Sequence, residues 1–301
     1  MCSICSLSSK RRIKQGLHCY MNAKTDENSR LRPPLKWAGG KRWLVPHLIT
    51  IWKRHSRRRY VEPFCGGLAV ALGLAPQNAL LNDINPQLIN FYRQVQQGLE
   101  LKIEMRNEQT LFYQQRERFN ELMHASKTNG NGNGTTRRLR SSQSLEAAQL
   151  FYYLNRTCFN GLCRFNQSGE FNVPFGTYKS ITYATDFFAY KEVFRNWAFS
   201  NSDFESIPFA ADDFIYADPP YDVEFTTYSA GGFSWKDQVR TADLLSKHPG
   251  PVVISNQATK RIVSLYKRLG FKLSYLDAPR RISCTGDRSS AREVLATKNI
   301  Q

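Results

Sequence analysis

The hydrophobic positions of this chain follow two alternating patterns. Short apolar runs at residues 214–216 and 252–255 are bounded by turn-forming residues and predict buried strands. From residue 35 to about residue 85 the pattern predicts loop, helix, strand, Gly-rich turn, helix and strand, which is typical of a βαβ unit. Residues 86–123 and 145–154 have apolar positions three to four apart and are expected to be helical.

These elements predict an α/β sheet interrupted by a largely helical insertion. We assign residues 31–85 and 186–301 to the sheet domain, and residues 86–185 to the inserted domain. Within the insertion, residues 127–144 are rich in Gly, Asn, Ser and Thr and are expected to form a flexible loop. Residues 155–178 combine Asn, Gly and aromatic side chains, which favours a β-hairpin.

The charge distribution indicates a polyanionic partner. The net charge is +17; residues 1–60 hold 15 Lys and Arg against 2 Asp and Glu, and residues 260–301 hold 10 against 3. Basic ends favour nucleic acid, whose phosphates dominate affinity, although an anionic membrane or a solubility role is compatible with the charge. Residues 1–30 lack periodic apolar positions and are predicted to be a disordered basic tail, so translation can start at Met1 or Met21.

The remaining composition excludes several classes of protein. No apolar run is long enough to span a bilayer and the start of the chain is too polar for a signal peptide, so we expect a soluble protein without a membrane partner. Seven scattered cysteines, an odd number, favour a reducing compartment such as the cytoplasm. Cys2 and Cys5 form one C-x-x-C pair without a second pair at zinc-ligand spacing, and no metal is expected.

The strongest candidate for chemistry is the end of the predicted strand at 214–216. Asp218, Pro219 and Tyr221 follow it in the stretch ADPPY, where two prolines enforce a stiff turn. The Asp218 carboxylate and the Pro219 carbonyl can accept the two hydrogens of an exocyclic amino group while Tyr221 stacks on its ring. Simple turn punctuation with a core tyrosine is the alternative interpretation.

A Gly-rich turn follows the first strand of the βαβ unit. Gly66 and Gly67, after Phe64, expose backbone N–H groups and permit close approach of a ligand. Asp83 ends the next strand about 20 residues further on, where a ribose diol is commonly bound. The alternative interpretation of Asp83 is a helix cap and turn, and the two interpretations are compatible.

Two further segments combine charge with aromatic or amide side chains. In KWAGGK, Lys41 can pair with a carboxylate and Trp37 can pack on an adenine or a sulfonium; an exposed charged loop is the alternative. Residues 155–176 contain the Arg and Asn side chains that read base edges and phosphates, with an aromatic or Leu able to enter a base stack. A packed hairpin with an aromatic core is equally compatible with residues 155–176.

Taken together, these segments resemble the Dam family of S-adenosylmethionine-dependent DNA adenine-N6 methyltransferases. The resemblance extends from about Leu35 to Ala296. The matching segments, in order, are LKWAGGK, VEPFCGG, LLNDIN, NRTCFNGLCRFN with GEFNVPFG, ADPPY, and RRIS at 280–283. The fourth is the most specific, because it belongs to DNA recognition within this family.

The resemblance implies a Rossmann-like class-I methyltransferase sheet with an inserted target-recognition domain of helices and a β-hairpin. It implies that S-adenosylmethionine is bound by Trp37, Lys41, Phe64, Gly66, Gly67, Asp83 and Asp218, and that Asp218, Pro219 and Tyr221 are catalytic. The expected reaction is methyl transfer to N6 of adenine in duplex DNA. An adenine inside a duplex must be flipped out to reach the methyl donor.

The resemblance also implies the DNA contacts. Lys36 matches a residue that helps to read the target, Phe159 one that inserts where the adenine leaves, and Arg164 one that reads a guanine. The full expected set is Lys36, Arg156, Phe159, Asn160, Leu162, Arg164, Asn166, Asn172 and Pro174. The match at Leu162 and Arg164 makes GATC the expected target.

The chain departs from the family pattern without losing a catalytic residue. Thr177 stands where a basic residue is common, and Leu68 replaces the second glycine of a G-x-G turn. Cytosine-N4 or RNA methylation, and a catalytically idle DNA-binding module, are the rival functions. We expect a DNA-associated bacterial, phage or plasmid protein that acts as a monomer, either solitary or within a restriction-modification system.

Overall fold

The computed structural model describes residues 31–127, 139–222, 232–278 and 291–300, and those from Arg32 onward belong to one compact unit. The predicted basic tail, Cys2 and Cys5, and the RRIS segment at 280–283 lie outside the described residues.

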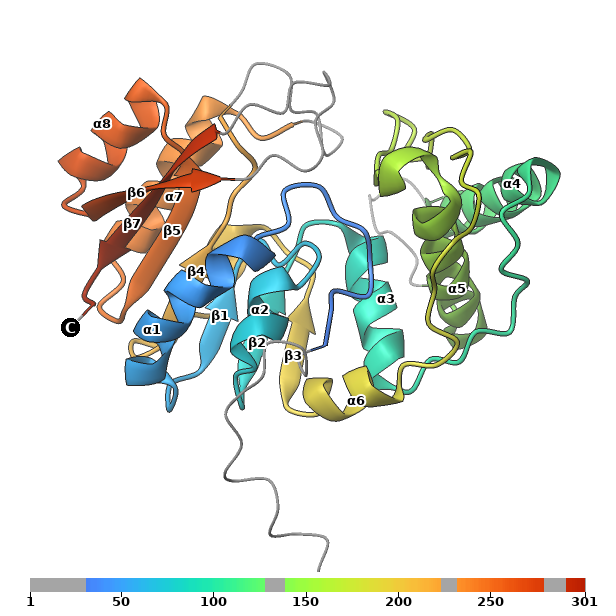
Figure 1. Cartoon of the computed structure of the whole chain (residues 1–301), viewed down its shortest axis with the longest axis horizontal. Helices are drawn as coiled ribbons and strands as arrows, with labels where there is room; N and C mark the ends of the chain where they lie inside the picture. The colour runs from blue at the N-terminus through green and yellow to red at the C-terminus, as the bar shows by residue number, and fades with distance from the viewer. Residues whose placement is uncertain (1–30, 128–138, 223–231, 279–290, 301) are drawn as a thin grey trace, which may run out of the picture. The chain divides into compact units, whose positions relative to one another are not determined.

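A seven-stranded sheet forms the centre of the unit, with the strand order β3-β2-β1-β4-β5-β7-β6 (Figure 1). Neighbouring strands among β1 to β5 are parallel, whereas β7 is antiparallel to both β5 and β6. The strands are β1 (Tyr60–Glu62), β2 (Ala79–Asn82), β3 (Trp197–Ser200), β4 (Phe214–Ala217), β5 (Val252–Gln257), β6 (Lys272–Ala278) and β7 (Ala291–Lys298). This order is the predicted Rossmann-like α/β fold.

Helices cover both faces of the sheet because right-handed crossovers run in opposite directions from its centre. In Figure 1, α1 and α2 lie in front of the sheet and α3 stands beside its β3 end. Helices α7 and α8 connect β4, β5 and β6, and they pack on the other face. The helices are α1 (Val45–His55), α2 (Ala69–Leu74), α3 (Pro86–Gln96), α4 (Gln109–Lys127), α5 (Ser141–Thr157), α6 (Phe188–Phe194), α7 (Trp235–Ser246) and α8 (Lys260–Arg268). Short 3₁₀ turns are η2 (Arg42–Leu44), η3 (Phe159–Gly161) and η4 (Phe204–Ser206).

An aromatic cluster joins the inserted helices to the sheet. Phe91 of α3 stacks on Tyr152 of α5, with ring centroids 5.6 Å apart, and Phe187 packs edge-on against both rings. Tyr92, on the neighbouring position of α3, packs on Phe199 of β3. All these rings are buried, so they form a continuous apolar contact region along α3 between the insertion and the sheet.

Three local expectations differ from the structure. Residues 86–123 form two helices, because α3 ends at Gln96 and Gly98 adopts φ +92°, a conformation that favours glycine. Both ends of the segment 127–144 are helical, since α4 extends to Lys127 and α5 begins at Ser141. Residues 155–157 end α5, and the expected hairpin after them is held by two isolated bridges, Cys158↔Phe175 and Phe165↔Phe171.

Candidate active site

The carboxyl ends of the central strands bring the predicted chemical residues together. Because β1, β2 and β4 are parallel neighbours, their carboxyl ends lie at one edge of the sheet. The Gly66 turn follows β1, Asp83 follows β2 and Asp218 follows β4. The strand order reverses between β1 and β4, and in open α/β sheets ligands bind at that crevice.

Asp218 is held at this edge by two side chains from different segments. Its Oδ2 lies 3.1 Å from Lys41 Nζ, and its Oδ1 accepts a hydrogen bond of 2.8 Å from the Ser255 hydroxyl of β5. That hydroxyl also bonds the hydroxyl of buried Tyr216, at 2.8 Å. The Asp218 side chain is 18% exposed; burial raises its pKa, and Lys41 and Ser255 partly oppose that change by stabilising the carboxylate.

Tyr221 and Lys41 form one cluster with a residue that the sequence did not indicate. The Lys41 ammonium donates to the Tyr221 hydroxyl and lies 4.4 Å from the centre of its ring. The Tyr221 hydroxyl donates to the Glu293 carboxylate of β7. A single Glu in the apolar run of β7 was the available signal, but only the pairing of β7 with β5 shows which edge of the sheet it reaches.

The Gly-rich turn is shaped to receive Trp37. A Cβ on Gly66 would lie 2.7 Å from the indole Nε1, and one on Gly67 would lie 2.7 Å from Trp37 Cβ. Gly66 has φ +42°, and its carbonyl accepts a 2.6 Å hydrogen bond from the Tyr92 hydroxyl. Leu68 follows in the left-handed region with φ +62°, a backbone conformation that glycine adopts more readily than leucine. The structure therefore brings the KWAGGK loop onto the turn.

Asp83 stabilises the same turn from the next strand. Its Oδ2 accepts from the Gly66 backbone N–H at 3.0 Å, and its Oδ1 accepts from the Asn85 N–H at 2.9 Å. Asn85, rather than Asp83, caps α3 by accepting from the N–H groups of Gln87 and Leu88. Burial raises the pKa of Asp83 to about 6, against the effect of the two N–H groups.

Residues 155–176, which are predicted to contact DNA and are called the recognition segment, are fixed at their base to the KWAGGK loop (residues 36–41). Asn155 Oδ1 accepts from the Lys36 N–H at 2.9 Å, and Asn155 Nδ2 donates to the Lys36 carbonyl at 2.8 Å. The Lys36 ammonium lies 4.0 Å from the centre of the Tyr178 ring. Gly161, with φ +62°, passes so close that a Cβ there would lie 2.5 Å from Lys36 Cβ.

Beyond this contact, the recognition segment presents side chains to solvent. Phe159 is 50% exposed, and its N–H donates to the Pro174 carbonyl at 2.9 Å. Asn160, Arg164 and Pro174 are also exposed, whereas Leu162 is half-buried. Asn160 adopts φ +54°, so the chain turns sharply directly after Phe159.

Three other predicted DNA-binding residues make contacts within the protein. Arg156 donates to the Pro34 carbonyl and stacks on Tyr152, 5.2 Å from the ring centre. Asn166 bonds Glu170 across the hairpin turn. Asn172 accepts from Arg164 Nε at 3.0 Å, which orients the Arg164 guanidinium. These contacts are structural, and DNA binding by Arg156, Asn166 and Asn172 stays a prediction.

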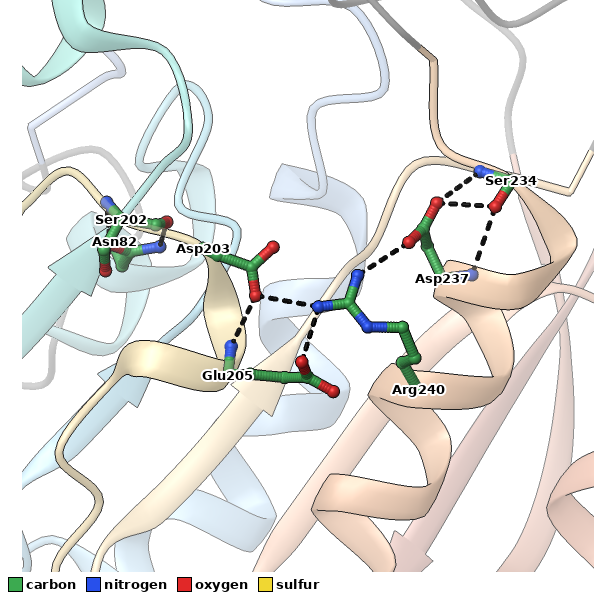
Figure 2. A network of polar contacts seen from close by, with 7 residues as sticks. All are labelled: Asn82, Ser202, Asp203, Glu205, Ser234, Asp237 and Arg240. Atoms are coloured by element: carbon green, nitrogen blue, oxygen red, sulfur yellow. Dashed lines mark hydrogen bonds and ion pairs between the residues drawn. The ribbon is translucent and has the colours of Figure 1, made fainter. Parts of the chain in front are cut away.

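The carboxyl ends of β2 and β3 are joined by amide contacts absent from the sequence predictions. The Asn82 amide donates to the carbonyls of Pro63 and Ser202, both at 3.0 Å. Its oxygen accepts from the Ser200 hydroxyl and from the Ser202 N–H. Figure 2 shows Asn82 beside Ser202. This side chain therefore fixes the loops after β1 and β3 beside Asp83.

A charged network fixes the loop after β3, which contains η4, to α7. Arg240 of α7 contacts Asp203 at 3.1 Å, Glu205 at 2.5 Å and Asp237 at 2.8 Å, and Asp237 completes a capping box with Ser234 (Figure 2). The Arg240 guanidinium also covers the Phe204 ring, which packs on Phe64 with centroids 5.5 Å apart. Phe64 is thus anchored in an aromatic cluster at the site edge.

The described residues contain neither a candidate metal site nor a membrane-spanning helix. Among them, no group of three or more His, Cys, Asp and Glu side chains is placed to hold a metal ion. No helix in that part of the chain is long and apolar enough to cross a membrane.

Comparison with known proteins identifies the family. The profile of the D12 class N6 adenine-specific DNA methyltransferases matches residues 37–282. The chain belongs to this family, and it is therefore an enzyme that methylates N6 of adenine in DNA with a methyl donor.

Curated relatives agree over most of the chain. The type II methyltransferase M1.LlaDCHI of Lactococcus lactis is 35% identical over 289 residues, covering 90% of this chain and 95% of that protein. The retron Ec67 DNA adenine methylase of Escherichia coli is 33% identical, covering 89% and 91%. The DNA adenine methylase of Escherichia coli is 35% identical, covering 87% and 93%.

One solved structure, a precorrin-6y C5,15-methyltransferase from Geobacter metallireducens, matches 91% of this chain and 95% of its own. Its TM-score is 0.38 at 8% identity, which is too low to bear on the present site.

Proposed function

We propose that this enzyme transfers a methyl group from S-adenosylmethionine to N6 of an adenine flipped out of duplex DNA, within the sequence GATC. The observation that carries the catalytic part is the position of Asp218. It stands at the carboxyl end of β4, beside a rigid Pro-Pro turn and next to the Gly66 turn and Asp83. Acceptance of the amino hydrogens by Asp218 and the Pro219 carbonyl would localise the N6 lone pair toward the methyl donor.

The Pro219–Pro220 turn is held in place by contacts within the protein, before any substrate enters. The Pro220 carbonyl accepts a 2.6 Å hydrogen bond from Gln238 of α7, and Pro219 is buried. The Asp218 carboxylate is oriented by Lys41 and Ser255. A preorganised acceptor needs little rearrangement during the reaction, which is the main source of electrostatic catalysis.

The residues at the site edge fit S-adenosylmethionine. Trp37 offers an indole over the Gly66–Gly67 turn, and Asp83 offers carboxylate oxygens in the position typical for a ribose diol. Lys41 and Asp218 complete the predicted set at the same edge. Bound there, the sulfonium supplies an electrophilic methyl group; the protein supplies binding, orientation and the acceptors for the amino hydrogens.

The recognition segment supports the proposed target. Exposed Phe159 at a sharp turn is suited to enter a base stack, and Arg164, oriented by Asn172, has the geometry for a guanine edge. Both belong to a segment whose base is bonded to Lys36, directly before Trp37. GATC rests on the resemblance at Leu162 and Arg164.

The test is transfer of labelled methyl from S-adenosylmethionine to two duplexes, one with GATC and one with that site scrambled. We expect N6-methyladenine in the GATC duplex alone. Label in both duplexes would discard GATC and keep the enzyme. Label in neither, with cofactor bound, would discard GATC and direct attention to another target.

Cofactor affinity is expected to depend on pH through Asp83. A carboxylate that accepts ribose hydroxyls binds them in its ionised form, and its pKa in the free enzyme is about 6. As pH falls below this value, Asp83 becomes protonated in the free enzyme. The affinity for S-adenosylmethionine should then approach a tenfold loss per pH unit. Above about pH 7 the affinity should be constant.

Calorimetric titration of the wild-type protein with S-adenosylmethionine between pH 5 and 8 checks this expectation. Asp83→Asn is the matched control, because it keeps the shape of the side chain without the titration. This variant should bind S-adenosylmethionine more weakly, and its affinity should lack the pH dependence that Asp83 causes. Parallel pH profiles for the two proteins would assign the effect to another group.

A further inference from the structure

Glu293 is a buried carboxylate at the active site that no predicted motif contains. It lies on β7 opposite Gln257 of β5 and is 5% exposed. Its Oε1 is 3.7 Å from Lys41 Nζ and accepts from the Tyr221 hydroxyl. Its Oε2 is buried, and no hydrogen-bond partner for it occurs among the described residues.

The cluster holds one ammonium between two carboxylates. Lys41 is only 4% exposed and lies 3.1 Å from Asp218 and 3.7 Å from Glu293. A buried cation with two acidic neighbours is attracted to both, and small displacements decide which pair is tighter. Tyr221, bonded to both Lys41 and Glu293, keeps them on the same side of the site.

The hydrogen bonds of Asp218 explain why the Lys41 ammonium needs a second acceptor. One of its oxygens is engaged by Lys41 and the other by Ser255. Each oxygen can accept a second hydrogen bond, but a carboxylate that also accepts an N–H of the target amino group shares its negative charge with that donor, which weakens its attraction for the ammonium. Without a second carboxylate, the buried Lys41 charge would then be balanced less completely, with the Gly39 carbonyl and the Tyr221 hydroxyl as its neutral partners, and this is unfavourable.

We propose that Glu293 is a positioning residue that receives the Lys41 ammonium when Asp218 engages the target amino group. A displacement of Lys41 Nζ of roughly 1 Å toward Glu293 would bring that pair to an ordinary ion-pair distance. The unpartnered Oε2 provides the additional acceptor for the arriving ammonium. This inference rests on the proposed role of Asp218, because it supplies the reason for the ammonium to move.

The role differs from support of the fold alone. A residue that only stabilises β7 would affect the melting temperature and both ligand affinities. A residue that receives Lys41 during the reaction affects kcat, because its contribution increases only as Asp218 takes the amino group.

The central variant is Glu293→Gln, which keeps shape and one acceptor oxygen but removes the charge. We expect kcat on the GATC duplex to fall about tenfold or more, while cofactor affinity, duplex affinity and melting temperature stay within about twofold or a few degrees. Glu192→Gln, the same change on the exposed surface of α6, is the control and should match the wild type.

Glu293→Asp provides a second, independent comparison if the glutamine variant folds poorly. Because it keeps the charge, it should retain more of kcat than Glu293→Gln. Unchanged kcat in Glu293→Gln, or glutamine retaining more activity than aspartate, would overturn the inference. So would a loss confined to ligand affinity. If the wild-type protein methylates neither duplex at N6 of adenine, it is the proposed function that fails.

Discussion

Asp218→Asn is expected to abolish methyl transfer while leaving duplex binding nearly intact. The amide keeps the size of the side chain but replaces one acceptor oxygen with a donor, and it cannot balance the Lys41 ammonium at 3.1 Å. The loss in kcat should be about 10³-fold or more, equivalent to about 4 kcal/mol of transition-state stabilisation. Single-turnover transfer of labelled methyl, together with duplex binding by fluorescence anisotropy, measures both quantities.

The matched control is Asp212→Asn, the same change at the other end of β4. Asp212 is exposed and precedes the strand, whereas Asp218 follows it. Wild-type activity is expected from the control. Methylation by Asp218→Asn at a rate near that of wild type would refute the role of the carboxylate as the acceptor of the amino hydrogens.

Gly66→Ala should produce the second-largest effect, through cofactor binding. The added Cβ would lie 2.7 Å from the Trp37 indole, and the turn would require alanine to adopt φ +42°. Left-handed backbone costs about 1–2 kcal/mol for a residue other than glycine, and displacement of Trp37 adds to this cost. We expect affinity for S-adenosylmethionine to fall about 100-fold, or about 2.7 kcal/mol, by calorimetry.

Gly270→Ala separates this local effect from general backbone strain. Gly270 has φ +78°, but the nearest atom to an added Cβ is the flexible Lys298 ammonium at 3.8 Å, away from the site. This variant should be less stable and bind the cofactor normally. Equal losses of affinity in both variants would show that the clash with Trp37 is not the cause of the loss in Gly66→Ala.

Much of the site followed from local sequence because its residues end strands. The runs at 214–216 and 252–255 correspond to β4 and β5, and parallel pairing places everything that follows such strands at one edge. Asp218, Asp83 and the Gly66 turn could therefore be grouped before their distances were known. Their chemistry depended on residue types that are rare in combination, such as an acid followed by two prolines.

The residues that sequence reasoning missed depend on long-range pairing. Glu293 reaches Lys41 only because β7 inserts antiparallel between β5 and β6, which no periodicity of 291–298 indicates. Arg240 reaches Asp203 across the carboxyl edge, and each side chain alone resembles ordinary surface charge. The interruption after α3 was missed because apolar spacing continued past Gly98, whose backbone conformation ends the helix.

The bonds between Asn155 and Lys36 have a thermodynamic consequence. Asn155 begins the recognition segment and holds both backbone groups of Lys36, while the adjacent Trp37 covers the Gly66 turn. A ligand that orders either the recognition segment or the KWAGGK loop reduces the entropy cost of binding the other ligand. DNA and cofactor should consequently bind with positive cooperativity, and each should raise the affinity for the other by the same factor.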